Sequence, residues 1–365
     1  MHSPPTSRRV VITASVAAIS MAALTSCASG TSSEATVDSI TVWTGLPYDS
    51  FQKPNAANFE RCEFETGITV ELEDFPPADL TGKVLQAATS GDLPDLLYLE
   101  GTDLSRVAET GVLTDLAEYG ISADGYSDIL VEMGSYEDTL YGLAPGVNTI
   151  GMFYDKALFA DSGVEIPTTF AELREVAHTL TTPDRMGVAL SAGSGAGPYV
   201  FLPFLLSAGG DPSDLTAPEA AMTMSGSWLF NEADGLGIDL GVFPIPSPDG
   251  TTPPRSPIGA ELWTIPVTDD AHQAAAADVL SCITSDENAL IMAEESRRTP
   301  GDVSVGQEYA IAHPDEAPLT ELIEGAYLRD PEVTGKQSEQ IALAVQDALA
   351  NGTDAADALA KAAGR

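Results

Sequence analysis

The fold follows from one stretch, residues 91–99, which reads GDLPDLLYL. Gly, Asp and Pro favour a turn, and the apolar run after them has the length of a buried strand. Upstream, residues 39–43 and 68–72 predict two more strands, each followed by a helical pattern; the first helix closes at Gly67 and the second spans residues 79–88. This alternation of strand and helix predicts a mostly parallel sheet in an α/β layer.

The second half of the chain continues the α/β pattern. Thr169 and Glu172 have the spacing of a capping box at the start of a helix. Prolines crowd residues 244–257 and predict a loop that connects two parts of the protein. After it we expect a strand over residues 258–267 and one long helix over residues 270–295.

The N-terminus has the pattern of an export signal. Arg8 and Arg9 precede an apolar run over residues 10–24, and Leu24-Thr25-Ser26-Cys27 follows. This ending resembles the bacterial lipobox, which implies a signal peptide over residues 1–26, a lipid on Cys27 and a flexible tether over residues 27–36. An ordinary signal cut nearby and an uncleaved anchor are the alternatives. The arginine pair leaves both Sec and twin-arginine export open.

The composition excludes several classes of partner. Against 55 Asp and Glu the chain has 16 Lys and Arg, a formal net charge of −39. Such a surface repels nucleic acid and anionic lipid headgroups, so we interpret it as a solvated acidic surface. With 44% hydrophobic residues the chain can form a core, and its length allows about two domains.

No pattern of catalytic or metal-binding residues is evident. His178, His272 and His313 are isolated from one another and from cysteine, and no CxxC occurs. The glycines of residues 193–197 lack the Lys-Ser/Thr ending of a phosphate-binding loop. We therefore expect no metal, no cofactor and no enzymatic activity; a glycosidase would need a carboxylate pair that the sequence does not reveal.

Five segments carry a resemblance to a known family. They read FETGITV (64–70), GDLPD (91–95), YGLAP (141–145) with Asn148 and Tyr154-Asp155-Lys156, AMTMSGSW (221–228), and Gly241-Val242 with Pro244 and Pro246. In this order they resemble the extracellular solute-binding lipoproteins of ATP-binding-cassette (ABC) importers, in the sugar-binding branch that includes maltodextrin-binding protein.

The resemblance implies an α/β, two-lobe, type II periplasmic-binding-protein-like fold with a hinge and an interlobe cleft. Lobe I would comprise residues 37–145 and 258–310, and lobe II residues 146–257 and 311–365. Lobe II would be shortened near residues 211–219, where the family carries a longer helical block. The implied protein is a monomer on the outer face of the membrane, held only by its lipid, that delivers a sugar to an ABC permease.

The resemblance also implies a set of ligand-binding residues. Aromatic rings would stack on sugar faces, and acids, amides and arginine would bind hydroxyls. The expected residues are Trp43, Tyr48, Glu100, Asn148, Tyr199, Trp228, Glu261, Trp263 and Arg298. For the tryptophans, burial in the core is the alternative. Two alternative functions remain. The protein could bind a non-sugar solute such as a polyamine, or it could be a surface lipoprotein of the same fold that no longer transports.

Cys62 and Cys282 remain once Cys27 is assigned to the lipid. An even pair in an oxidising compartment is compatible with a disulfide. By the resemblance, both would lie on helices of lobe I, which allows pairing but does not require it. Two buried thiols are the alternative.

Overall fold

The structure, a computed structural model, describes residues 37–46, 49–189 and 220–329, with the single positions 343, 353, 357, 360 and 361. Tyr48, Tyr199, Cys27 and the shortened segment at 211–219 lie outside the described residues. Within the described part of the chain, no helix combines the length and the apolar character needed to cross a membrane.

A large mixed sheet forms the centre of the structure. Its strands lie in the order β12-β7-β11-β3-β1-β2, and β6 pairs with β11. Strands β2, β1 and β3 are parallel, as predicted, whereas β11 runs antiparallel to β3. The strands are β1 (Ser39–Thr44), β2 (Thr69–Asp74), β3 (Leu96–Glu100), β6 (Gly142–Leu143), β7 (Gly146–Thr149), β11 (Ile258–Thr264) and β12 (Thr299–Pro300).

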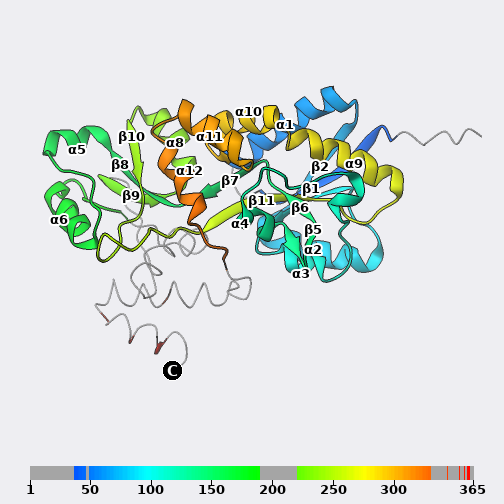
Figure 1. The fold of residues 1–365 in the computed structure, drawn as a ribbon, viewed down its shortest axis with the longest axis horizontal. Helices are drawn as coiled ribbons and strands as arrows, with labels where there is room; N and C mark the ends of the chain where they lie inside the picture. The colour runs from blue at the N-terminus through cyan, green and yellow to red at the C-terminus, as the bar shows by residue number, and fades with distance from the viewer. Residues whose placement is uncertain are drawn as a thin grey trace, which may run out of the picture. The chain divides into compact units, whose positions relative to one another are not determined.

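Helices cover both faces of this sheet (Figure 1). One face carries α1 (Asp49–Thr66) and α9 (Asp270–Ile283), and the other carries α2 (Pro77–Ser90) and α3 (Leu104–Ala108). Apolar side chains of the sheet and these helices form the larger core of the protein. Burial of this apolar area is the main force that holds the layers together.

A smaller antiparallel sheet has the order β10-β8-β9. It consists of β8 (Gly151–Asp155), β9 (Met222–Ser225) and β10 (Leu240–Phe243), and α5 (Lys156–Ser162), α6 (Phe170–Leu180), α8 (Trp228–Leu236) and α12 (Ala317–Glu324) accompany it. Leu319 and Leu322 of α12 pack with Phe153, Phe230 and Val242. Helix α12 thus returns to the small sheet although it is distant in sequence.

The chain crosses between the two sheets where the sequence predicts a connection. Only Ile150 separates β7 of the large sheet from β8 of the small one. The proline-rich residues 244–257 join β10 back to β11, and α12 contacts both β7 and β10. The remaining elements are η1 (Leu116–Tyr119), α4 (Asp128–Met133), β4 (Ser135–Tyr136), β5 (Thr139–Leu140), α10 (Asp286–Ser296) and α11 (Val303–Ala312).

Of two helix predictions made from local sequence patterns, the structure confirms one and contradicts the other. The capping box of Thr169 and Glu172 is confirmed. The single helix expected over residues 270–295 is wrong: it divides into α9 and α10, because Ser285 adopts an extended backbone and caps the second helix by accepting from Asn288 N. Ser and Thr side chains compete with helical hydrogen bonds in this way.

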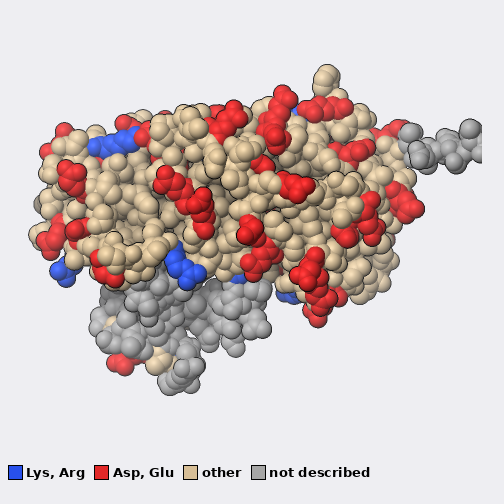
Figure 2. Space-filling model, viewed as in Figure 1, with Lys and Arg blue, Asp and Glu red and all other residues tan. Residues whose placement is uncertain are grey.

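Acidic side chains are spread over the face of the molecule in Figure 2, with few basic ones between them. They do not gather into one patch on this view. The distribution agrees with a solvated acidic surface.

The structure joins Cys62 of α1 to Cys282 of α9 through a disulfide, with an S–S distance of 2.01 Å and a Cα–Cα distance of 5.8 Å. The bond ties the N-terminal helix to a helix 220 residues further along the chain. A cross-link that closes so long a loop restricts the unfolded chain strongly.

We expect the double variant Cys62→Ala, Cys282→Ala to lose stability. The chain-entropy model gives about 5 kcal/mol for a loop of this length. Urea unfolding of the oxidised wild type and of the variant measures the difference, and reductant should destabilise only the wild type. Two free thiols in the untreated mature protein would contradict the pairing.

Candidate functional site

The register of the large sheet gathers several of the predicted residues on one face. Residues two apart in a strand, and residues paired across strands, share a face. The pairs are Glu261 with Glu100, Trp263 with Tyr98, and Gly259 with Asn148. Phe59 of α1 packs against Trp263, so this is the face that α1 covers.

The deeper part of this face is an ion pair between Glu261 and Arg298, whose residues are only 5% and 2% exposed. Burial lowers the pKa of the Arg298 guanidinium to about 9, which still leaves it charged at neutral pH. The guanidinium also lies over the ring of Phe51, 4.3 Å from the ring centre. Two opposite charges and an aromatic face thus form a fixed polar layer.

The outer part is a second ion pair, between Glu100 and Arg329, which remains partly exposed. Tyr98 Oη donates to Glu100 Oε2 at 3.2 Å. Burial raises the pKa of Tyr98 well above its usual value, and the negative charge of Glu100 acts in the same direction. Tyr98 is therefore a neutral donor that orients a carboxylate able to reach solvent.

Trp228, the first residue of α8, lies partly buried beside this face. Its ring is 6.1 Å from the ring of Phe51, with a tilt of 44° between the planes. A Cβ at Gly226 would overlap the Trp228 ring, so the ring can fold against the backbone only because that residue is glycine. Trp228 packs against the cores of both sheets, which makes it a contact between them.

A hollow of about 380 Å³ adjoins Glu100. Its lining residues come from the segment after β3, from α3, α4 and the β4–β5 hairpin, from the start of β11 and from the segment after α12: Gly101, Thr102, Leu104, Ser105, Glu132, Met133, Ser135, Tyr136, Glu137, Ile258, Leu328 and Arg329. The volume is in the range of small-molecule sites, and the lining offers carboxylates, hydroxyls, an arginine and one aromatic ring.

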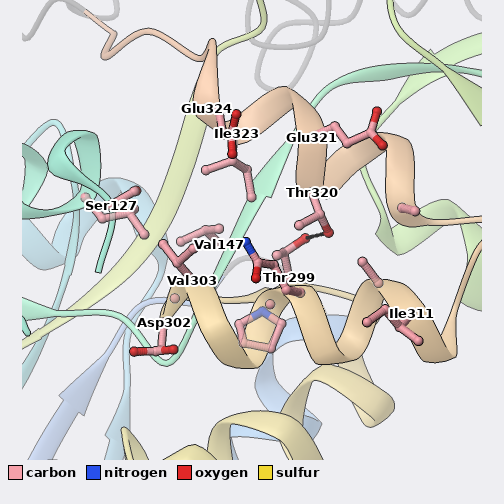
Figure 3. Close-up of a pocket in the computed structure, with 17 residues that line it drawn as sticks. Ser127, Val147, Thr299, Asp302, Val303, Ile311, Thr320, Glu321, Ile323 and Glu324 are labelled. Atoms are coloured by element: carbon pink, nitrogen blue, oxygen red, sulfur yellow. Dashed lines mark hydrogen bonds between the residues drawn. The ribbon is translucent and has the colours of Figure 1, made fainter. Parts of the chain in front are cut away.

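A larger cavity of about 480 Å³ lies between α4, β7, α11 and α12 (Figure 3). Thr299 and Thr320 share a hydrogen bond across it, and Asp302 caps α11 by accepting from Ser304 N and Val305 N. None of its lining residues is aromatic. It therefore lacks the stacking surface that a sugar ring requires.

The structure does not bring two of the expected tryptophans into the site. Trp43 neighbours Thr44 in β1 and points to the opposite face, where Phe75 lies 5.3 Å from its ring and Lys83 4.3 Å. Trp263 is fully buried, with its ring packed by Phe59 and Tyr98. The alternation of side chains along β1 turns Trp43 to the opposite face, and the packing of α1 buries Trp263.

Five of the expected residues lie on or beside the same face of the large sheet: Glu100, Asn148, Trp228, Glu261 and Arg298. Asn148 is buried beside Gly259 of β11. Sequence reasoning missed three further residues: Phe51, Tyr98 and Arg329. Only the scarcity of basic residues pointed to Arg329. In a chain with 16 Lys and Arg against 55 Asp and Glu, each arginine is a candidate partner for a carboxylate.

No group of three or more His, Cys, Asp or Glu among the described residues has a geometry that could hold a metal ion. The charged groups of the site form two ion pairs instead, Glu261 with Arg298 and Glu100 with Arg329. The arrangement can bind and orient a polar molecule.

Comparison with known proteins gives the class. A family model described as bacterial extracellular solute-binding protein matches residues 44–290. The chain therefore belongs to this family, whose members bind solutes and are not enzymes. The predicted two-lobe α/β fold is confirmed.

Individual relatives are distant. The galactooligosaccharide-binding protein of Bacillus subtilis (strain 168) is 22% identical over 327 aligned residues, which cover 76% of each chain. The GacH receptor of Streptomyces glaucescens has a TM-score of 0.76 at 20% identity, covering 89% of this chain and 96% of the other. UgpB from Mycobacterium tuberculosis, solved with glycerophosphocholine, has a TM-score of 0.76 at 17% identity, with 89% and 96% covered.

We expect Arg298→Met to destabilise the protein by about 3–5 kcal/mol, because it leaves the Glu261 carboxylate buried without a partner. Adding Glu261→Leu should restore most of this loss. The matched control Arg329→Met breaks the partly exposed pair and should cost less than about 1 kcal/mol. Urea unfolding of the wild type, Arg298→Met, Glu261→Leu, their double variant and Arg329→Met tests this; strictly additive effects of the two single substitutions would contradict a coupled pair.

Proposed function

We propose that this protein captures a carbohydrate outside the cytoplasm and delivers it to an ABC importer. The observation that carries the proposal is the position of Trp228 beside Phe51, whose ring lies under the guanidinium of the Glu261–Arg298 ion pair. Sugars pack their C–H faces on aromatic rings and bind acids, amides and arginine through their hydroxyls. Trp228 would supply the ring, and Glu100 with Arg329 the hydroxyl partners.

The relatives support this class of solute without fixing the ligand. One is named for galactooligosaccharides, and the GacH receptor was solved with acarbose. UgpB was solved with glycerophosphocholine instead. The fold therefore accommodates other polar solutes, and a test must include them.

The two sheets suit a protein that closes on its ligand. We assign residues 37–145 and 258–310 to lobe I and residues 146–257 and 311–365 to lobe II, and the packing of α12 on the small sheet supports this division. Glu100 extends from the large sheet and Trp228 starts a helix of the small one. A ligand that contacts both would favour the closed form through its differential affinity.

A panel of solutes tests the proposal. Thermal unfolding with neutral oligosaccharides, spermidine and glycerophosphocholine should show stabilisation by an oligosaccharide, about 2.7 kcal/mol at a hundred times Kd. Stabilisation by spermidine or glycerophosphocholine alone would replace the carbohydrate with that solute. Trp228→Ala should weaken binding of the active sugar by about fivefold to a hundredfold, since a stacking ring contributes about 1–3 kcal/mol. Trp43→Phe, on the opposite face, is the matched control and should bind normally.

We also propose that Cys27 carries a lipid and that residues 27–36 tether the folded body to the outer face of the membrane. The apolar run before Leu24-Thr25-Ser26-Cys27 supports this. Cys27→Ser should release the protein from the membrane fraction into the medium and abolish incorporation of labelled fatty acid. Retention of label in the variant would contradict the anchor.

A further inference from the structure

A smaller cavity lies under the first helix, between α1 and the large sheet. Its volume is about 180 Å³, and its walls come from the end of β1, the end of β2, β11 and the inner side of α1: Thr44, Leu46, Gln52, Lys53, Asn55, Ala56, Phe59, Leu72, Asp74 and Trp263. Thr44 and Asp74 are the last residues of two adjacent parallel strands. Ligands of open α/β sheets bind at such strand ends.

Two buried polar atoms on residues that line this cavity have no hydrogen-bond partner among the described residues. They are Thr44 Oγ1 and Trp263 Nε1, on residues that are 2% and 0% exposed. Phe59 and Tyr98 pack against the Trp263 ring, and its buried Nε1–H is left without a hydrogen-bond acceptor among the described residues. Buried polar atoms in proteins nearly always have a partner, and the described residues supply none for these two.

The other polar groups of the wall are already engaged. Gln52 Nε2 donates to Leu46 O at 2.9 Å and to Asp74 Oδ2 at 3.2 Å. Asn55 Nδ2 donates to Phe51 O at 2.9 Å. The Lys53 ammonium pairs with Asp49 at 2.7 Å, on the exposed side of the helix. The two free groups are therefore uncharged, which favours a neutral ligand over an ion.

We propose that this cavity binds the hydroxyls of a neutral polyhydroxylated ligand. One ligand oxygen would accept from Trp263 Nε1–H, and a hydroxyl would exchange hydrogen bonds with Thr44 Oγ1. The volume exceeds that of a 150 Å³ cavity that takes up benzene, so one six-membered ring can enter. The ligand is either a free small polyol or monosaccharide, or the end of the oligosaccharide of the proposed function; only the second source rests on that function.

The indole N–H signals of the chain's three tryptophans provide the readout. Trp263→Phe assigns the signal of Trp263 in an NMR spectrum of the ¹⁵N-labelled protein. Titration with glycerol, D-galactose and the oligosaccharide found by the solute panel should shift this signal saturably. Ala56→Leu fills the cavity and should abolish the shift, whereas Ala57→Leu changes the neighbouring residue, which does not line the cavity, and should leave it unchanged.

Thr44→Val provides a second, independent variant. It removes an unpartnered hydroxyl while keeping the side-chain shape, so the melting temperature should stay level or rise. Binding in the cavity should weaken about fivefold to tenfold, the effect of one hydrogen bond. A loss of stability would instead mean that Thr44 has a structural partner, and would overturn the proposal.

The outcomes separate the two sources and the two proposals. A shift with glycerol or galactose indicates a free small ligand, and a shift with the oligosaccharide alone indicates its terminal ring. If no probe moves the Trp263 signal while the oligosaccharide still binds through Trp228, the cavity holds only water and this inference fails, but the proposed function stands. If galactose moves the Trp263 signal and no oligosaccharide binds, the cavity inference stands and the proposed function fails.

Discussion

The antiparallel pairing of β3 with β11 is the constraint on which the rest of the site depends. It sets Glu100 directly opposite Glu261, and like charges so placed repel each other. The structure resolves the conflict with two arginines, Arg298 for the buried carboxylate and Arg329 for the outer one. Both arginines come from segments that follow α10, more than a hundred residues after β3. The site therefore exists only when the C-terminal part of the chain has returned to the large sheet.

This arrangement divides the site into a rigid and an accessible layer. Glu261 and Arg298 are buried and hold Phe51 through the guanidinium, which in turn supports the ring of Trp228. Glu100 remains partly exposed and is oriented by Tyr98. Because the side chains of the rigid layer are already held in place, a ligand has to order fewer of them on binding. This lowers the entropy cost of binding and raises affinity. The disulfide between α1 and α9 adds to this rigidity, since α1 carries Phe51.

The sequence predicted much of the fold, and its failures have local causes. Alternating strand and helix patterns before residue 100 gave the parallel β2-β1-β3 unit, because each element has strong periodicity. The helix over residues 270–295 was misjudged, since the apolar pattern continues across Ser285 while the backbone does not. Trp43 was expected to bind ligand from its position at a strand end. That position does not say which face of the sheet its side chain takes, and Trp43 lies against α2.

The sequence by itself indicated the class of protein, a solute-binding protein of α/β fold, with Glu100, Glu261 and Trp228 among its polar and aromatic candidates. Periodicity, turn residues and the order of short segments are local properties, and one sequence is enough to show them. Only the tertiary structure decided which candidates meet. Three features arise from contacts between distant segments. They are the register of β3 and β11, the ion pairs of Arg298 and Arg329, and the cavity beneath α1. Local patterns do not encode such contacts, because they depend on how whole layers pack.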